Sequence, residues 1–238
     1  MTIDGRDVTA QIPRRQGRVL LTYLVVNRQR HCSRDELMDV LWAESLPPDA
    51  EGALSTVLSR LRTAIGASAL VGRSEVRLLL PADAWIDLEA ADEAIHRAES
   101  AVAQQQWARA WGPSLVALFV ARRGFLRGED GPWIDVQRRR LDDIRCLALE
   151  CYTAVALGIG GTELHVGERT ARELIDQAPF RESGYRLLME VLAARGNIAE
   201  ALRVYEELRS LLREELGATP SPPIQALQVR LLKSAESR

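Results

Sequence analysis

The strongest constraint on the fold is a helical repeat of apolar residues that runs from about Asp87 almost to the C-terminus. Clusters of glycine and proline, which end helices, interrupt this pattern at short intervals. The interruptions fall at Gly112–Pro113, Gly128–Pro132, Gly158–Gly161, Pro179, Gly196–Asn197 and Gly217–Pro223. The spacing predicts about seven antiparallel helices joined by short connections.

The helices also recur in pairs, at a period near the roughly 34 residues of tetratricopeptide repeats. The clearest pair covers residues 185–212, with a turn at Gly196–Asn197. Its expected packing residues are Tyr185, Leu188, Leu192, Ala201 and Tyr205. Small and aromatic residues occupy such positions in these repeats. We therefore predict an all-α, tetratricopeptide-like helical repeat domain over residues 87–238, and the alternative is a generic helical bundle.

The first part of the chain has a different order of elements. Asp4–Gly5 is a hairpin-turn dipeptide, so a short strand pair is expected before a first helix within residues 14–27. Ser33 and Glu36 form a capping box that starts a second helix, with Ser33 as the N-cap and Glu36 reaching back to it. The two prolines in segment 43–49 end this helix, because proline cannot continue one.

A third helix follows, with Asp49 as its N-cap and Gly66 at its end. Its apolar residues form one helical stripe: Leu54, Val57, Leu58, Leu61 and Ile65. Two strands, Leu70–Val71 and Val76–Leu80, then flank a polar turn. Strands, three helices and a hairpin in this order predict an N-terminal winged helix-turn-helix over residues 1–86.

The face of the third helix opposite the apolar stripe is small and polar. Thr56 and Ser59 lie on this face, and Ser55, Arg60 and Arg62 flank it. Such a helix can lie close to the floor of the DNA major groove, where hydroxyls contact bases or phosphates and guanidinium groups bind phosphates or guanine. The alternative is an ordinary solvated helix face.

Three further arginines extend this basic footprint. Arg34 lies in the first turn of the second helix, whose positive end favours a phosphate. Arg73 and Arg77 lie on the expected wing. The candidate DNA-binding residues are therefore Arg34, Ser55, Thr56, Ser59, Arg60, Arg62, Arg73 and Arg77.

The net charge of the chain and the distribution of its arginines indicate which kind of nucleic-acid binding to expect. The net charge of −2 counts against a protein that coats nucleic acid nonspecifically. Residues 1–80 hold 11 arginines against 9 acidic residues, whereas the remainder holds 20 basic and 24 acidic residues. Lys233 is the only lysine, so nearly all positive charge sits on guanidinium groups, which can clamp a phosphate or a guanine edge. A genome rich in G and C explains the arginine preference equally well.

Enzyme, metal and membrane signals are missing from the sequence. The chain has neither a phosphate-binding P-loop nor a Gly-x-Ser-x-Gly motif, so we expect no catalysis and no cofactor. Its three cysteines and three histidines lack the spacing of a disulfide framework or a zinc site, so we expect no metal. No apolar run is long enough to cross a membrane and no signal peptide is recognisable, so the prediction is cytoplasmic.

With these motifs identified, the chain resembles the bacterial transcriptional activator domain family, which includes the SARP regulators (Streptomyces antibiotic regulatory proteins). In the second half, the resemblance rests on GFLRG at 124–128, WI at 133–134, QRRRL at 137–141, PFRE at 179–182, RLLM at 186–189, AEAL at 199–202, Tyr205 and ELGATPSP at 215–222. In the first half, SRDEL at 33–37 and SRLR at 59–62 resemble the OmpR-type winged helix of this family. The resemblance covers nearly the whole chain.

The resemblance implies an activator that binds direct repeats upstream of promoters as a homodimer and recruits RNA polymerase. Segment 43–49 corresponds to the part of OmpR-type folds that faces the polymerase. The chain departs from the family in three ways. Family members have a further strand before the point where this chain starts, Gly52 stands where an arginine is common, and Asp49 and Glu51 add negative charge at the same end. A single subunit should therefore bind DNA weakly, and useful affinity should need two subunits on adjacent sites.

We therefore predict a mostly α-helical regulator in which residues 1–86 bind double-stranded DNA. Residues 87–238 would serve dimerisation, contact with RNA polymerase, or regulation. The alternative is a protein-interaction or signalling module, part of or partner to a larger regulatory protein, whose winged helix has lost DNA binding. Gly52 and the near-neutral charge favour this alternative, whereas the polar face of the third helix disfavours it.

Overall fold

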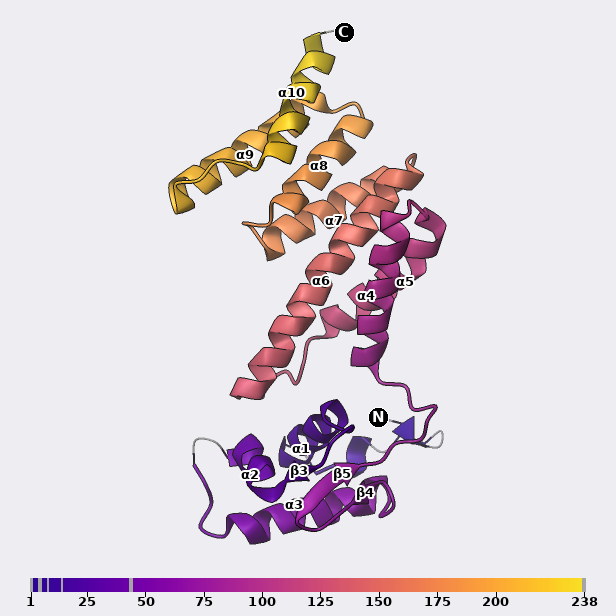
Figure 1. Ribbon diagram of the computed structural model, residues 1–238, viewed down its shortest axis with the longest axis vertical. Coiled ribbons are helices and arrows are strands. Elements are labelled where there is room, and N and C mark those ends of the chain that lie inside the picture. Colours follow the sequence, from indigo (N-terminus) through magenta and orange to yellow (C-terminus); the bar gives the residue numbers. More distant parts are fainter. Residues whose placement is uncertain (1, 4–5, 8, 14, 43–44, 237–238) are drawn as a thin grey trace. The chain divides into compact units, whose positions relative to one another are not determined.

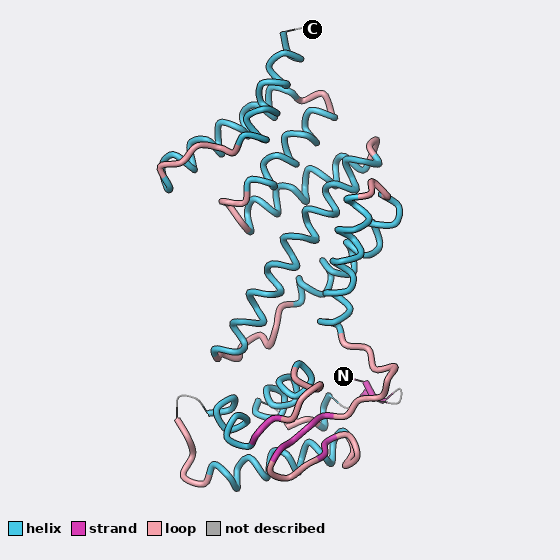
Figure 2. Tube along the Cα trace, in the orientation of Figure 1, coloured by secondary structure: helices cyan, strands magenta, loops and turns pink. Residues whose placement is uncertain are grey.

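Helices make up most of the chain, and its strands lie within the first 80 residues (Figure 1; Figure 2). The computed structural model describes residues 2–3, 6–7, 9–13, 15–42 and 45–236. They form two compact units. Unit 1 consists of Met1–Trp85 with Phe125–Arg138, and unit 2 of Ile86–Gly124 with Arg139–Arg238. The predicted fold class, a winged helix followed by a helical domain, is confirmed.

Unit 1 starts with a strand pair and a helix, as predicted. Strands β1 (Thr2–Ile3) and β2 (Arg6–Asp7) pair antiparallel, and a short 3-10 helix, η1 (Thr9–Gln11), follows them. The predicted turn at Asp4–Gly5 lies outside the described residues. Helix α1 (Arg15–Val26) lies within the predicted range 14–27 and ends at two β-branched valines, which are weak helix formers.

A small sheet accompanies the next two helices, α2 (Arg34–Trp42) and α3 (Ala50–Ile65). Its strands are β3 (Cys32–Ser33), β4 (Leu70–Val71) and β5 (Glu75–Leu78). They lie in the order β3-β5-β4, and both pairings are antiparallel. The β4–β5 hairpin was predicted. β3 was not, because it exists through its pairing with β5 and no short turn in the sequence links the two strands.

The predicted helix caps are mostly confirmed. The Asp49 carboxylate accepts the Gly52 N–H at 2.9 Å, and the Gly66 N–H donates to the Arg62 carbonyl at 3.0 Å. The Ser33 hydroxyl accepts the Glu36 N–H at 3.2 Å, which is one half of the capping box. The other half is wrong. The Glu36 carboxylate turns to Arg30 and Tyr23, because hydrogen bonds from a guanidinium are stronger than one from a neutral amide.

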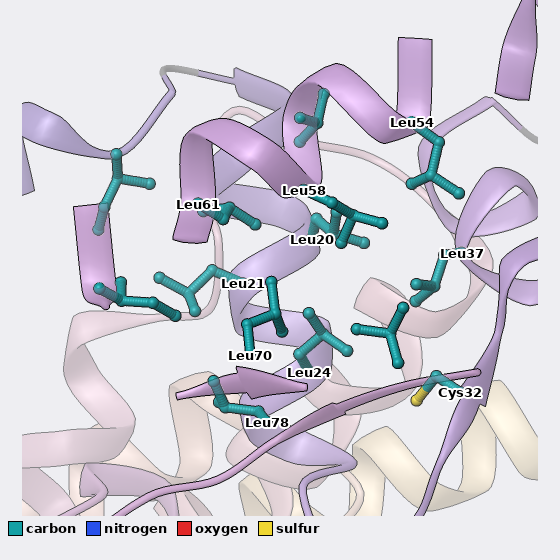
Figure 3. Close-up of a cluster of buried hydrophobic side chains, with 14 residues drawn as sticks. Leu20, Leu21, Leu24, Cys32, Leu37, Leu54, Leu58, Leu61, Leu70 and Leu78 are labelled. Carbon is teal, nitrogen blue, oxygen red and sulfur yellow. The ribbon is translucent and has the colours of Figure 1, made fainter. Parts of the chain in front are cut away.

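The core of unit 1 lies between the three helices and the hairpin. Figure 3 shows its side chains, which come from every one of these elements: Leu20, Leu21, Leu24, Cys32, Leu37, Leu54, Leu58, Leu61, Leu70 and Leu78. The predicted apolar stripe of α3 is buried along its full length. Because this face of α3 points into the core, the opposite face points outward.

Unit 2 is built from helices. They are α4 (Asp87–Ala103), α5 (Trp107–Arg123), most of α6 (Pro132–Ile159), α7 (Glu163–Gln177), α8 (Glu182–Ala194), α9 (Ile198–Leu216) and α10 (Pro222–Glu236). Helices α4 and α5 pack against each other, and α7, α8 and α9 pack in succession. The residues predicted to pack the 185–212 pair are all buried in one cluster.

One predicted interruption is wrong, because Gly112–Pro113 lies inside α5. The chain instead turns between α4 and α5 at residues 104–106, where Gln105 adopts a φ of 56°. Glutamine is uncommon in this left-handed region, so the sequence carried no signal for the turn.

Within the part of the chain that the structure describes, no helix is both long and apolar enough to cross a membrane. Over the same residues, no cluster of three or more histidine, cysteine, aspartate or glutamate side chains could hold a metal ion.

The boundary between the two units lies within one residue of that between the predicted domains, 1–86 and 87–238, but one segment is assigned differently. Segment Phe125–Arg138, which the sequence assigned to the helical domain, belongs to unit 1. Helix α6 therefore starts within unit 1 and continues into unit 2.

Candidate nucleic-acid interface

The outer face of α3 carries the predicted polar surface. Ser55, Thr56, Ser59 and Arg60 are all exposed on it, because the leucine stripe occupies the opposite side of the helix. The Thr56 hydroxyl donates to the Gly52 carbonyl of its own helix at 3.0 Å. A hydroxyl that donates in this way still offers its lone pairs to an incoming donor.

Two arginines of this surface present their guanidinium groups to solvent. Arg60 and Arg73 are exposed, and among the described residues neither guanidinium has a hydrogen bond or ion pair. The Ser59 hydroxyl is similarly open over the same residues. These groups can meet a phosphate or a base without first breaking a contact within the protein.

Arg34 is placed differently from what the sequence suggested. Its guanidinium donates to the Glu51 carboxylate at 2.7 Å, to the Ser55 hydroxyl at 2.8 Å and to the Arg73 carbonyl at 3.4 Å. Its side chain is only 21% exposed. Arg34 therefore ties the start of α2 to α3 and to the hairpin turn. A phosphate would have to compete with Glu51 for it, and Arg34 in turn offsets the negative charge of Glu51.

Arg62 and Arg77 hold the hairpin in place. The Arg62 guanidinium donates to the Leu70 carbonyl at 3.1 Å and to the Gly72 carbonyl at 2.8 Å. The Arg77 guanidinium donates to the Arg28 carbonyl at 3.2 Å. Both side chains are half-buried. Among the eight predicted residues, the structure thus joins the side chains of Arg34 and Ser55. It also engages Arg62 and Arg77 with backbone carbonyls, so these two arginines hold the hairpin instead of facing solvent.

Gly52, which departs from the family pattern, has a local explanation. A Cβ at this position would lie 2.1 Å from the Asp49 carboxylate oxygen Oδ2. Glycine therefore leaves room for the capping carboxylate to fold over the first turn of α3.

Sequence reasoning missed a charged cluster at the start of α2. The Arg30 guanidinium donates to the Glu36 carboxylate at 2.9 Å, and the Tyr23 hydroxyl donates to the same carboxylate. The hydrogen bond from Arg30 lowers the pKa of Glu36 despite the opposing effect of burial. Burial, followed by the hydrogen bond to Glu36, raises the pKa of Tyr23 to about 12.

A second group of contacts, from Arg15 and Tyr23 of α1 to segment Phe125–Arg138, was also missed. The partners are more than a hundred residues apart in the chain, so no local sequence pattern predicts these contacts. The GFLRG and WI motif lies in this segment, but in the sequence analysis it indicated only the family and did not predict a contact with α1.

Comparison with known proteins gives a family match and several relatives. Residues 86–232 match the family described as bacterial transcriptional activator domain. The regulatory protein AfsR of Streptomyces griseus is 35% identical over 228 residues, which cover 93% of this chain and 22% of that protein. The AfsR of Streptomyces coelicolor is 36% identical over 234 residues, with 97% and 23% coverage.

A third relative extends the comparison to a solved structure. The transcriptional regulatory protein EmbR of Mycobacterium tuberculosis is 27% identical over 245 residues, which cover 98% of this chain and 61% of that protein. Its structure in complex with a low affinity phosphopeptide superposes with a TM-score of 0.79 at 24% identity, covering 98% of this chain and 62% of that chain. This likeness extends over both units of the fold. The chain spans between 22% and 61% of the length of these curated relatives.

Proposed function

The chain belongs to the bacterial transcriptional activator domain family, and from this premise we propose that it is a cytoplasmic, sequence-specific DNA-binding regulator of transcription. The observation that carries the proposal is the outer face of α3, where exposed hydroxyls and an open guanidinium lie opposite a fully buried stripe. A helix with short polar side chains can lie close to base edges in the major groove of double-stranded DNA.

The contacts around α3 suggest a division of roles within the proposed interface. Thr56, Ser59, Arg60 and Arg73 would touch DNA, because their polar groups are exposed. The other four candidates, Arg34, Ser55, Arg62 and Arg77, would mainly position the helix and the wing, because their side chains contact one another, Glu51 or backbone carbonyls. Replacing Arg62 would therefore disturb the hairpin as well as the proposed interface, whereas replacing Arg60 or Arg73 would not.

For unit 2, we propose contact with RNA polymerase and activation of transcription. A groove of about 290 Å³ supports a protein-binding role. Helices α4, α6 and α8 line it with mostly small or apolar side chains and with three charged ones: Glu99, Val102, Ala103, Glu150, Cys151, Ala154, Ser183, Arg186 and Leu187. An apolar groove with a few charged groups is suited to a side chain or short segment of a partner.

The test is DNA binding by fluorescence anisotropy across a salt series. Wild type is compared with Arg60→Ala/Arg73→Ala and with a matched control, Arg203→Ala/Arg230→Ala, which removes two exposed arginines from unit 2. If Arg60 and Arg73 contact phosphates, the slope of log affinity against log salt should become shallower by about 2 in the first variant only, because two phosphate contacts are lost.

Arg62→Ala adds a second comparison. It should weaken binding while leaving the salt slope near that of wild type, because its guanidinium is engaged by the hairpin.

A wild-type protein that binds no DNA at low salt would contradict the proposal. The remaining candidate would then be a protein-interaction module with a degenerate winged helix. The engagement of Arg34, Arg62 and Arg77 within the fold favours that candidate, because it leaves few open guanidinium groups around α3.

A further inference from the structure

The family's GFLRG and WI motif lies in a segment that packs against α1. The ring of Trp133 meets the ring of Tyr23 edge-on, with centroids 5.0 Å apart and planes at 82°. The same Trp133 ring meets Phe125 at 5.6 Å and 88°. Edge-to-face pairs of this kind are favoured because the positive ring edge meets the negative ring face. Helix α1 and the segment therefore share one aromatic cluster within unit 1.

A buried charge joins the same two parts of the chain. Glu129 is only 8% exposed, and its carboxylate accepts the Arg15 Nε–H at 2.7 Å. A carboxylate removed from water needs such a partner, because an unpaired buried charge is costly. Arg15 is the first residue of α1, so this pair fixes the start of the helix whose later residue Tyr23 meets Trp133.

Arg138 holds the segment in its own shape. Its guanidinium donates to the Phe125 carbonyl at 3.3 Å, to the Leu126 carbonyl at 3.0 Å and to the Glu129 carbonyl. Leu126 has a φ of 41°, a conformation that leucine rarely adopts and that persists where the surroundings impose it. The turn that presents Phe125 and Glu129 is thus closed onto the first turns of α6.

Trp133 is placed by packing rather than by a hydrogen bond of its own. Its indole N–H is buried, and no described group accepts it. A tryptophan usually finds a partner for this N–H when it is buried. The position of Trp133 is therefore set by the rings around it.

The contacts continue from Tyr23 toward α3. The Tyr23 hydroxyl donates to Glu36, whose own N–H is capped by Ser33 at the start of α2. The next residue after Ser33 is Arg34, which binds Glu51 and Ser55 of α3. Each step from Trp133 to α3 is a contact between neighbouring groups.

We infer that segment Phe125–Arg138 is an integral part of the DNA-binding unit, in which Trp133 and Glu129 are positioning residues that hold α1 and the start of α2. The winged helix of residues 1–86 is therefore incomplete without a segment from much later in the chain. The effect on DNA affinity rests on the proposed function, whereas the effect on α1 and α2 does not.

The experiment measures hydrogen exchange and DNA affinity of the full chain carrying Trp133→Ala. The matched control is Trp111→Ala, which removes another half-buried tryptophan, from α5 of unit 2. We expect the amides of α1 and α2 to exchange about tenfold faster in Trp133→Ala than in wild type or the control. DNA affinity should fall about tenfold with an unchanged salt slope, because no phosphate contact is lost.

Two further variants keep the inference open to disproof if Trp133→Ala does not fold. Trp133→Phe retains an aromatic edge for Tyr23 and should recover most of the wild-type exchange and affinity. Glu129→Gln keeps the side-chain shape but removes the charge that meets Arg15, so it should speed exchange at the start of α1. Unchanged exchange of α1 and α2 in Trp133→Ala, or in Glu129→Gln where the first variant is unfolded, overturns the inference. Faster exchange in a protein whose wild type binds no DNA supports the inference and overturns only the proposed function.

Discussion

At the scale of single residues, the arginines around α3 differ in what their guanidinium groups contact. Arg62 donates to two backbone carbonyls of the hairpin, whereas Arg60 faces solvent two positions earlier in the same helix. The planar guanidinium can reach both carbonyls at once, which the single ammonium of lysine cannot reproduce with the same geometry. The same residue type therefore serves the fold at one position and is available to a ligand at the other.

Glu36 gives a prediction about pH at this scale. Its pKa in the folded protein is lowered from the ordinary value of 4.5, chiefly by the hydrogen bond from Arg30. A lowered folded pKa means that the carboxylate stabilises the fold in full above its unfolded pKa, and that this contribution is lost as the pH falls through the folded pKa. Between about pH 5 and pH 3, the free energy of unfolding should therefore fall less steeply in Glu36→Gln than in wild type.

Urea unfolding at a series of pH values checks this prediction. Asp39→Asn is the control, because Asp39 is an exposed carboxylate on the same helix. Equal losses of stability in wild type and Glu36→Gln over this range would contradict the role given to Glu36.

At the scale of elements, the sequence predicts what is local. The buried stripe of α3, its Asp49 cap and its Gly66 end all follow from residues within a few positions of one another. Strand β3 was missed because its pairing with Val76 joins residues 44 positions apart. The contacts of Arg34 with α3, and the place of segment Phe125–Arg138 in unit 1, were missed for the same reason. The contacts of Arg62 join residues only 8 and 10 positions apart, but they depend on how the hairpin folds back against α3.

The first turn of α3 gives a prediction about coupling between neighbours. Asp49→Ala should cost about 1 kcal/mol in the free energy of unfolding, because the N-cap hydrogen bond to Gly52 is lost. Gly52→Ala should be close to neutral in wild type, since the better helix propensity of alanine is offset when its Cβ displaces the Asp49 carboxylate. In the Asp49→Ala background, the same Gly52→Ala change should stabilise the protein by up to about 1 kcal/mol, because nothing is displaced.

A double-mutant cycle by chemical denaturation measures this coupling. Ser59→Ala, on the exposed face of the same helix and away from its first turn, serves as the independent partner whose effect should add to that of Asp49→Ala. Additive effects of the Asp49 and Gly52 substitutions would contradict the explanation that glycine at position 52 leaves room for the Asp49 carboxylate.

At the scale of the whole molecule, most arginine side chains form contacts within the protein. Unit 2 pairs arginines with carboxylates between its helices, as in Arg122 with Glu173, Arg172 with Glu200 and Arg181 with Glu150. The net charge of the chain is −2. Long-range attraction to DNA should therefore be weak, and under the proposed function the affinity would come from the few open groups on α3 and the hairpin.

This balance predicts how binding should depend on the number of DNA sites. The family resemblance implies a homodimer on DNA. Once a preferred sequence has been selected, we therefore expect a duplex with one copy to bind weakly and a duplex with two tandem copies to bind at least about a hundredfold more tightly, because the second subunit of such a dimer would bind at a high effective concentration. Lengthening the spacing by half a helical turn, about 5 base pairs, should remove the gain, since it puts the two subunits on opposite faces of the DNA.

Titrations of the three duplexes by anisotropy, with the stoichiometry from sedimentation, distinguish the outcomes. Equal affinity per site on all three duplexes would contradict this prediction, because a single subunit would then supply the whole affinity. Each open guanidinium group around α3 would in that case have to contribute more to binding than one phosphate contact usually does.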